Sequence, residues 1–187
     1  GILVARGDLA VEVGNERVPL LQKKIIRKTN LRGKTVIIAT QMLMSMVDNP
    51  RPSRAEASDV ANAIVDGTDA GMLSNETAVG KYPLEAIGMM CKITEEMEAD
   101  PEPQPILYDE WELPEGGQEY IAVLQSAVRL ASIAKAKWIV VVTQSGYSAT
   151  LVSKCRPNNR VLAVTSSMEA YRQLALKWGV EGIVMED

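Results

Sequence analysis

Three short apolar runs, each followed by a segment with helical spacing, divide the N-terminal half of the chain into units of about 35 residues. The runs are GILVA at 1–5, TVIIAT at 35–40 and AGMLS at 70–74. Continuous apolar runs of this length are typical of strands that a parallel sheet buries on both faces. Because parallel strands need a long crossover between them, the alternation predicts βα units of a parallel α/β sheet.

Cap and breaker residues mark where the connecting helices begin and end. Asn15 is the expected N-cap of the first helix, and Gly33 ends that helix. Ser53 and Glu56 form a capping box, in which each side chain accepts a backbone N–H from the other's turn. Pro83 opens the third helix. These signals place a helix after each predicted strand.

A stretch of different composition separates the two halves of the chain. Residues 100–117 are rich in proline and acidic residues and have no apolar period, which predicts a linker between domains at 1–99 and 118–187. The second domain repeats the α/β pattern, with helices at 121–134, after 145–150 and at 168–178, and strands at 138–143, 161–165 and 182–185. Both chain ends cut through predicted elements, so we expect a piece of a longer protein.

Composition excludes several classes of function. The net charge is −4 with acidic and basic residues interspersed, which does not favour nucleic-acid binding. No apolar stretch approaches the ~20 residues of a membrane span. Histidine is absent, which removes catalytic triads and His-bound metals. Cys91 and Cys155 lie far apart and are predicted to be buried free thiols in a reducing cytoplasm.

Polar residues follow each predicted strand of the first domain, at 6–8, 40–41 and 74–77. Ligand sites of parallel α/β folds form at the carboxyl ends of the strands, so these residues are predicted to share one edge. Asp8 is the leading candidate, because Gly7 lets the backbone approach a ligand and a carboxylate suits Mg²⁺ or Mn²⁺. On spacing alone, however, a capping or turn role is favoured for Asp8. The apolar neighbours disfavour an exposed Arg-Gly-Asp adhesion loop.

Three further features have open roles. Thr40 offers a hydroxyl either to a ligand or to the backbone at the end of its strand. Glu76 either faces the same edge or pairs with an arginine such as Arg54. TQSGYSAT at 143–150 lies between a strand and a helix, which predicts either a phosphate loop or a Ser/Gly turn with an N-cap.

The segments around these residues resemble the pyruvate kinase family. The resemblance is carried by VARGDLAVEV (4–13), IIATQMLMSM (37–46), NPRPSRAEASDVANAIVDGTDAGMLSNETAVGKYPLEA (49–86) and TQSGYSA (143–149). It implies that the first domain is the last three βα units of a (β/α)8 TIM barrel. The second domain would then be the first part of a three-layer α/β domain that binds effectors.

The resemblance also implies an activity and roles for individual residues. The family transfers a phosphoryl group from phosphoenolpyruvate to ADP in glycolysis, uses Mg²⁺ or Mn²⁺ and often K⁺, and forms cytoplasmic homotetramers. Asp8 matches a carboxylate ligand of the divalent cation that also borders the substrate. Gly7, with Arg6, matches the loop whose amides hold substrate oxygens. Thr40 matches the catalytic threonine that contacts the substrate and helps organise protonation of the enolate.

A separate loop matches the family's effector site. Its matching residues are Thr143, Ser145, Gly146 and Ser148. Tyr147 stands where the family usually has arginine, which weakens the case for a bisphosphate sugar. Three possibilities stay open for this loop: a monophosphate effector, a nucleotide effector, or no effector.

The family's remaining catalytic groups belong to earlier strands. They are the phosphoryl-stabilising lysine, a second metal carboxylate and the K⁺ ligands, so we expect this chain to be inactive alone. The outer edges of the strands at 1–5 and 70–73 are predicted to lack partners, which favours self-association or a rearranged half-barrel. Two alternatives stay open: a non-catalytic effector-binding or oligomerisation module, and another barrel enzyme that uses phosphoenolpyruvate or pyruvate.

Overall fold

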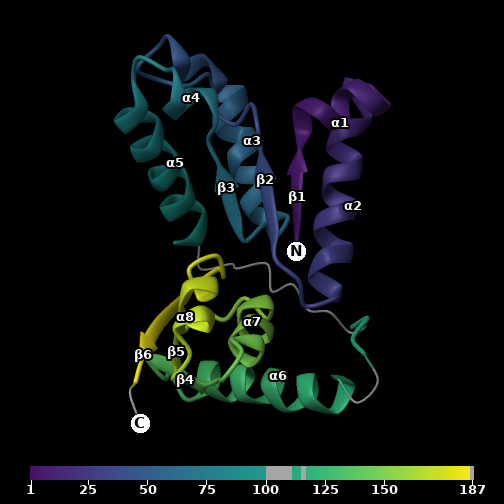
Figure 1. Cartoon of the computed structure of the whole chain (residues 1–187), viewed down its shortest axis with the longest axis vertical. Helices are drawn as coiled ribbons and strands as arrows, with labels where there is room; N and C mark the ends of the chain where they lie inside the picture. The colour runs from purple at the N-terminus through teal and green to yellow at the C-terminus, as the bar shows by residue number, and fades with distance from the viewer. Residues whose placement is uncertain (100–110, 115–116, 186–187) are drawn as a thin grey trace. The chain divides into compact units, whose positions relative to one another are not determined.

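A computed structural model of the chain describes residues 1–99, 111–114 and 117–185 (Figure 1). The described residues form an α/β fold with two sheets, and every strand pairing in both sheets is parallel. The predicted fold class is confirmed. Over the described residues each sheet is open and three-stranded, so these residues form no closed barrel.

The chain divides into two compact units. Residues 1–28 and 36–99 belong to the first unit, whereas residues 29–35 belong to the second unit with the described residues after 110. Most of the predicted linker at 100–117 lies outside the described residues. Trp111, which lies within that stretch, is buried in the second unit against Leu151 and its neighbours.

The first sheet has the order β1-β2-β3, formed by β1 (Ile2–Ala5), β2 (Val36–Ala39) and β3 (Ala70–Met72). Ala39 is paired in register with both Ala5 and Met72, so all three strands end at the same edge. Figure 1 shows the polar segments that follow these strands at that edge. This shared edge is the one that the sequence predicts.

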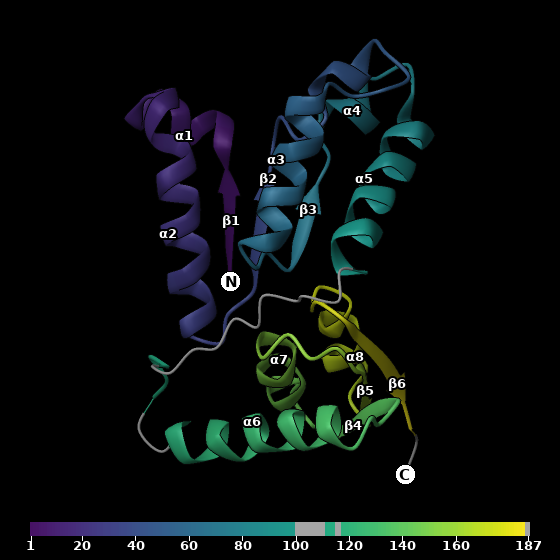
Figure 2. The ribbon, with the colours of Figure 1, turned by 180° about the vertical axis from the view of Figure 1, so that it is seen from behind.

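Helices connect these strands, as predicted, but the first connection holds an additional helix. The connecting elements are α1 (Arg6–Val13), η1 (Asn15–Arg17), α2 (Val18–Leu31), η2 (Met44–Val47) and α3 (Arg54–Val65), and α4 (Asn75–Ala78) and α5 (Pro83–Glu98) follow β3. Figure 2 shows α3 in front of β2. The capping box of Ser53 and Glu56 is confirmed. The prediction that Asn15 caps a helix is wrong, because Asn15 lies within the 3-10 turn η1, which follows Gly14.

The core of the first unit lies between the strands and helices. Its buried apolar residues are Val4, Ile26, Val36, Ile38, Met42, Leu43, Met46, Val60, Ala63 and Ala86. Burial of β1 on both faces is not observed, since Ile2 and Leu3 are 48% and 47% exposed. Among the described strands β1 pairs only with β2, so no described strand pairs with its other edge.

The second unit is built around the sheet β4-β5-β6. Its elements are α6 (Gly117–Ile133), β4 (Trp138–Val142), α7 (Tyr147–Lys154), β5 (Arg160–Thr165), α8 (Met168–Leu174) and β6 (Val180–Val184). The helix predicted at 168–178 ends early, at Leu174. There the backbone N–H of Lys177 bonds to the carbonyl of Leu174, a turn that replaces the next helical bond.

Buried groups from several elements hold the second unit together. One core cluster joins α7 to β5 and α8 through Ala149, Val152 and Leu174. The Lys154 ammonium is 1% exposed and donates a 2.7 Å hydrogen bond to Oδ1 of Asn30. A buried lysine needs such a partner, because burial of an unpaired charge is costly.

The two cysteines have different environments. Cys155 is partly buried, and burial raises the pKa of its thiol to about 11. The prediction that both thiols are buried is wrong for Cys91, which is exposed on α5. Both are free of disulfides, as predicted. No described helix is long and apolar enough to cross a membrane.

Candidate active site at the carboxyl edge of the first sheet

The strand register brings the loops after β1 and β2 into direct contact. Because Ala5 pairs with Ala39, the next residues of both strands are neighbours. The backbone N–H of Gly7 donates a 3.0 Å hydrogen bond to Oγ1 of Thr40. A backbone amide and a hydroxyl from strand ends that are far apart in sequence therefore meet at one point.

The backbone just after β2 has an unusual conformation. Thr40 and Gln41 both adopt positive φ angles, 68° and 54°. This left-handed region is sterically costly for residues with a Cβ, and Thr is β-branched, so each such residue costs about 1–3 kcal/mol. Conformations of this kind persist where surrounding contacts hold them, and they cluster at functional sites.

Arg6 supplies those surrounding contacts. Its Nε and Nη2 donate to the carbonyl of Thr40 at 3.1 and 2.9 Å, and Nη2 also donates to the carbonyl of Gln41 at 2.8 Å. Nη2 lies 3.0 Å from Sδ of Met42 as well. Nη1 forms a 2.5 Å ion pair with Asp59 of α3. The guanidinium is 9% exposed and is directed into the protein.

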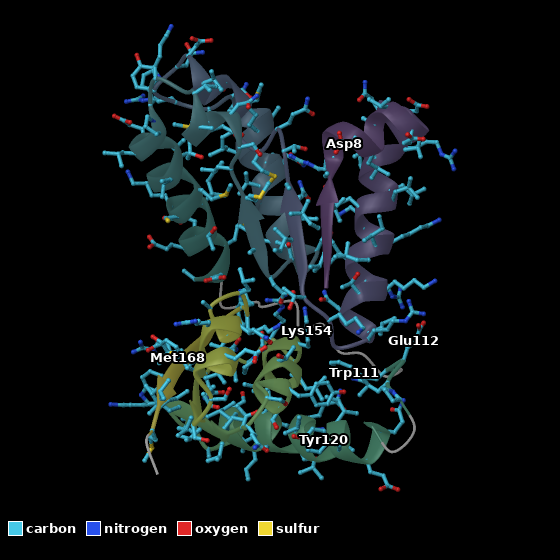
Figure 3. All side chains as sticks on the ribbon, in the orientation of Figure 1. Asp8, Trp111, Glu112, Tyr120, Lys154 and Met168 are labelled. Carbon is cyan, nitrogen blue, oxygen red and sulfur yellow. The ribbon has the colours of Figure 1, made fainter. Side chains whose placement is uncertain are left out.

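Asp8 has the opposite environment. It lies in the first turn of α1 and is exposed, and its carboxylate makes no hydrogen bond or ion pair with any described residue (Figure 3). A negative charge in the first turn of a helix is favoured by the helix dipole. The carboxylate is therefore stabilised where it stands and is open to a ligand.

Glu76 holds the loop after β2 from its other side. The residue is fully buried, and its Oε1 accepts the N–H of Leu43 at 3.0 Å while Oε2 accepts the N–H of Ser74 at 2.8 Å. Of the two roles left open by the sequence, pairing with Arg54 is not observed, because the carboxylate of Glu76 accepts backbone N–H groups at the edge where β2 and β3 end. Its two partners come from the loops after β2 and β3, so Glu76 ties these loops together.

Asp8 is an exposed carboxylate at the carboxyl edge of the first sheet. The described residues contain no group of three or more His, Cys, Asp or Glu side chains that could hold a metal. Mg²⁺ is commonly bound by one or two carboxylates together with substrate phosphates and water. A single exposed carboxylate fits that kind of site if the substrate supplies further oxygen ligands.

The loop at 143–148 in the second unit has its own geometry. Gly146 has φ 78° and donates its N–H to Oγ1 of Thr143 at 3.0 Å. The hydroxyl of Tyr120 donates to Oγ of Ser148 at 2.5 Å, and the Tyr120 and Tyr147 rings are stacked with centroids 6.3 Å apart. The structure thus gathers Thr143, Gly146 and Ser148 around the start of α7. Figure 3 labels Tyr120 on α6.

Comparison with known proteins gives this geometry a family context. Residues 1–87 match the model of the pyruvate kinase barrel domain, and residues 121–187 match that of the pyruvate kinase alpha/beta domain. The chain belongs to the pyruvate kinase family. The two matched regions together span most of the chain, and they agree with the predicted resemblance.

Relatives within the pyruvate kinase family extend beyond this chain. It is 49% identical to a pyruvate kinase of Clostridium acetobutylicum, aligning over the whole chain but only 39% of that protein. It is 48% identical to pyruvate kinase 2 of Synechocystis, of which it covers 31%. A crystal structure of a pyruvate kinase from Cryptosporidium parvum superposes with a TM-score of 0.91 at 41% identity, over 99% of this chain and 38% of that one.

The roles of two residues at the carboxyl edge of the first sheet were not predicted from the sequence. Asp59 lies in the middle of the helical segment that follows the capping box, and nothing local distinguishes it from a solvated acid. The contact of Met42 with Arg6 was not predicted either. The available signal was the arginine at the end of the first strand, because a buried guanidinium requires a carboxylate and several carbonyl oxygens as partners.

Proposed function

We propose that the protein containing this chain is a pyruvate kinase that transfers the phosphoryl group of phosphoenolpyruvate to ADP, and that the edge formed by β1 and β2 is one wall of its active site. The chain spans 31 to 39% of the curated relatives cited above, so the activity belongs to the whole protein. The observation that supports this site is the contact of the Gly7 amide with the Thr40 hydroxyl, next to the open carboxylate of Asp8.

Each of these groups has a role that suits phosphoryl transfer. In the proposed site Asp8 is a ligand of Mg²⁺ or Mn²⁺, which supplies neutralisation of phosphate and enolate charge when bound. The amides around Arg6, Gly7 and Asp8 hold substrate oxygens at the N-terminus of α1. The Thr40 hydroxyl contacts the substrate and organises protonation at the enolate carbon. Positioning and charge neutralisation are the main requirements of this reaction, and neither needs histidine.

Further properties are proposed from membership of the family. They are activation by K⁺, assembly as a homotetramer, and a cytoplasmic role in glycolysis. We also propose that Thr143, Ser145, Gly146 and Ser148 hold the phosphate of an effector. The supporting observation is that Gly146 starts α7, whose first amides are available for an anion. Adding sugar phosphates or nucleoside monophosphates to the assay below tests that loop.

The test uses the full-length protein in a coupled assay of pyruvate formation from phosphoenolpyruvate and ADP at varied Mg²⁺. Asp8→Ala is expected to lower kcat roughly a hundredfold and to raise the Mg²⁺ concentration needed for half-maximal rate, because a charged group at the reacting centre is lost. Glu12→Ala is the matched control, since Glu12 is an exposed acid on the same helix. It should keep both quantities near the wild-type values.

Two results would contradict the proposal. Absence of phosphoenolpyruvate-dependent ATP formation by the full-length protein would contradict the proposed activity and favour a non-catalytic module. An active enzyme in which Asp8→Ala behaves like Glu12→Ala would show that Asp8 is not a metal ligand.

A further inference from the structure

The left-handed backbone conformation of Thr40 and Gln41 requires stabilising contacts from other parts of the chain. Neither residue type favours positive φ, and in two successive residues the steric cost is incurred twice. The turn follows directly after β2, where the chain would otherwise continue in extended conformation. Contacts from outside the β2 strand must therefore hold it.

The carbonyl oxygens of the pair converge on one side chain. Nη2 of Arg6 donates to the carbonyls of both Thr40 and Gln41, and Nε donates a second bond to that of Thr40. The planar guanidinium presents its N–H groups in fixed directions, so one Arg can select a particular orientation of two successive peptide groups. A lysine at this position could not reproduce that pattern.

The orientation of Arg6 depends in turn on Asp59. Nη1 of Arg6 forms a 2.5 Å ion pair with Oδ2 of Asp59, which projects from α3. The guanidinium is 9% exposed, so loss of its carboxylate partner would leave a nearly buried cation without a counter-charge. Arg6 would then move toward water and release the two carbonyls.

We propose that Asp59 is a positioning residue for the reaction: acting through Arg6, it holds the Thr40–Gln41 turn left-handed and so keeps the Thr40 hydroxyl on the Gly7 amide. Asp59 touches neither Thr40 nor Gly7 in the described contacts, and its effect passes through the guanidinium. The kinetic part of this inference rests on the proposed function, whereas the conformational part concerns this chain alone.

The test compares three variants of the full-length protein. Asp59→Ala removes the carboxylate, Asp59→Asn keeps an acceptor oxygen without the charge, and Lys23→Met is the control. Lys23 forms an ion pair of the same 2.5 Å length with Asp66 in the first unit, and neither of these two residues bonds to the Thr40 turn in any described contact. Crystal structures report the φ angles of Thr40 and Gln41, and steady-state kinetics report kcat and KM separately.

In Asp59→Ala we expect the turn to leave the left-handed region and the Gly7–Thr40 hydrogen bond to be lost. kcat is expected to fall about ten- to a hundredfold, while KM for phosphoenolpyruvate stays within about threefold, because a displaced hydroxyl affects turnover more than binding. Asp59→Asn should lie between wild type and Asp59→Ala in kcat, and Lys23→Met should match wild type. A merely structural role would not produce this separation of kcat from KM.

Two results would overturn the inference. One is an Asp59→Ala structure, or an Asp59→Asn structure if the alanine variant does not fold, in which Thr40 and Gln41 keep positive φ and the Gly7 contact is intact. The other is an active wild type in which Asp59→Ala has the kcat of Lys23→Met. If the wild type does not use phosphoenolpyruvate, the proposed function fails, and the crystal structures still decide whether Asp59 holds the turn.

Discussion

At the scale of single residues, three carboxylates of the first unit have contrasting environments. Glu56 and Glu76 accept backbone N–H groups from neighbouring loops, whereas Asp8 is exposed without a described partner. Glu56 bonds the amide and hydroxyl of Ser45 as well as those of its capping partner, Ser53. Its contact with Ser53 was predictable because the two residues are three apart, but its contact with Ser45 was not.

The ionisation of Glu56 should make the free energy of unfolding depend on pH in the acidic range. Burial alone would raise the pKa of Glu56, but hydrogen bonds from Ser45 and Ser53 outweigh burial and lower the pKa. A lowered folded-state pKa contributes stability above the unfolded value of about 4.3, and that contribution is lost as pH falls through the folded-state pKa. Glu56→Gln should therefore reduce the free energy of unfolding by about 1 kcal/mol at neutral pH, which is the typical cost of losing a helix N-cap.

Urea unfolding at pH 7, 5, 4 and 3 measures this effect. The difference between wild type and Glu56→Gln should be constant down to about pH 4.3 and then shrink. Glu85→Gln is the control, because Glu85 is exposed and bonds to no described residue. A Glu56→Gln difference that is unchanged at pH 3 would show that the charge of Glu56 does not contribute.

At the scale of elements, helix ends were easier to predict where a cap or a glycine marks them. The start of α3 was predicted from its capping box. The helix α1 was missed, because the polar residues at 6–8 have turn chemistry and Gly7 lies in the first turn. The start of α7 depends on Gly146, whose φ of 78° is a conformation that residues with a Cβ rarely adopt.

Two glycine substitutions should therefore have opposite effects. Gly146→Ala is expected to reduce the free energy of unfolding by about 1 kcal/mol or more, because alanine is strained at positive φ. Gly88 lies within α5, and a Cβ there would meet no atom within 4 Å. Gly88→Ala should stabilise the protein by about 0.5–1 kcal/mol through helix propensity. Equal effects of the two substitutions in urea unfolding would contradict the backbone argument.

At the scale of the whole molecule, the first sheet has edges that no described strand pairs. β1 and β3 each pair only with β2 over the described residues. Two side chains of β1, Ile2 and Leu3, are about half exposed. Unpaired strand edges that carry apolar side chains are templates for association with another chain.

The 187-residue chain on its own is therefore expected to self-associate. Leu3→Lys should reduce the association, since a charge on an edge strand opposes pairing. Val11→Lys provides the control, because Val11 is 86% exposed but lies on α1 and not on a strand. Size-exclusion chromatography with light scattering measures the mass of each variant. A monomeric wild-type chain, or an equal loss of mass in both variants, would contradict an edge-mediated contact.

Local pattern alone determined the alternation of strands and helices, the parallel sheets and the edge at which polar residues gather. Period, caps and breakers act over a few residues, so the sequence displays them directly. Tertiary structure decided which side chains serve that edge. Arg6 meets Thr40 from 34 positions away and Asp59 from 53, and Glu76 reaches Leu43 across 33. These bonds pair buried charges and hold a strained turn, and both exist only once the strands are assembled. No local sequence pattern therefore predicts them.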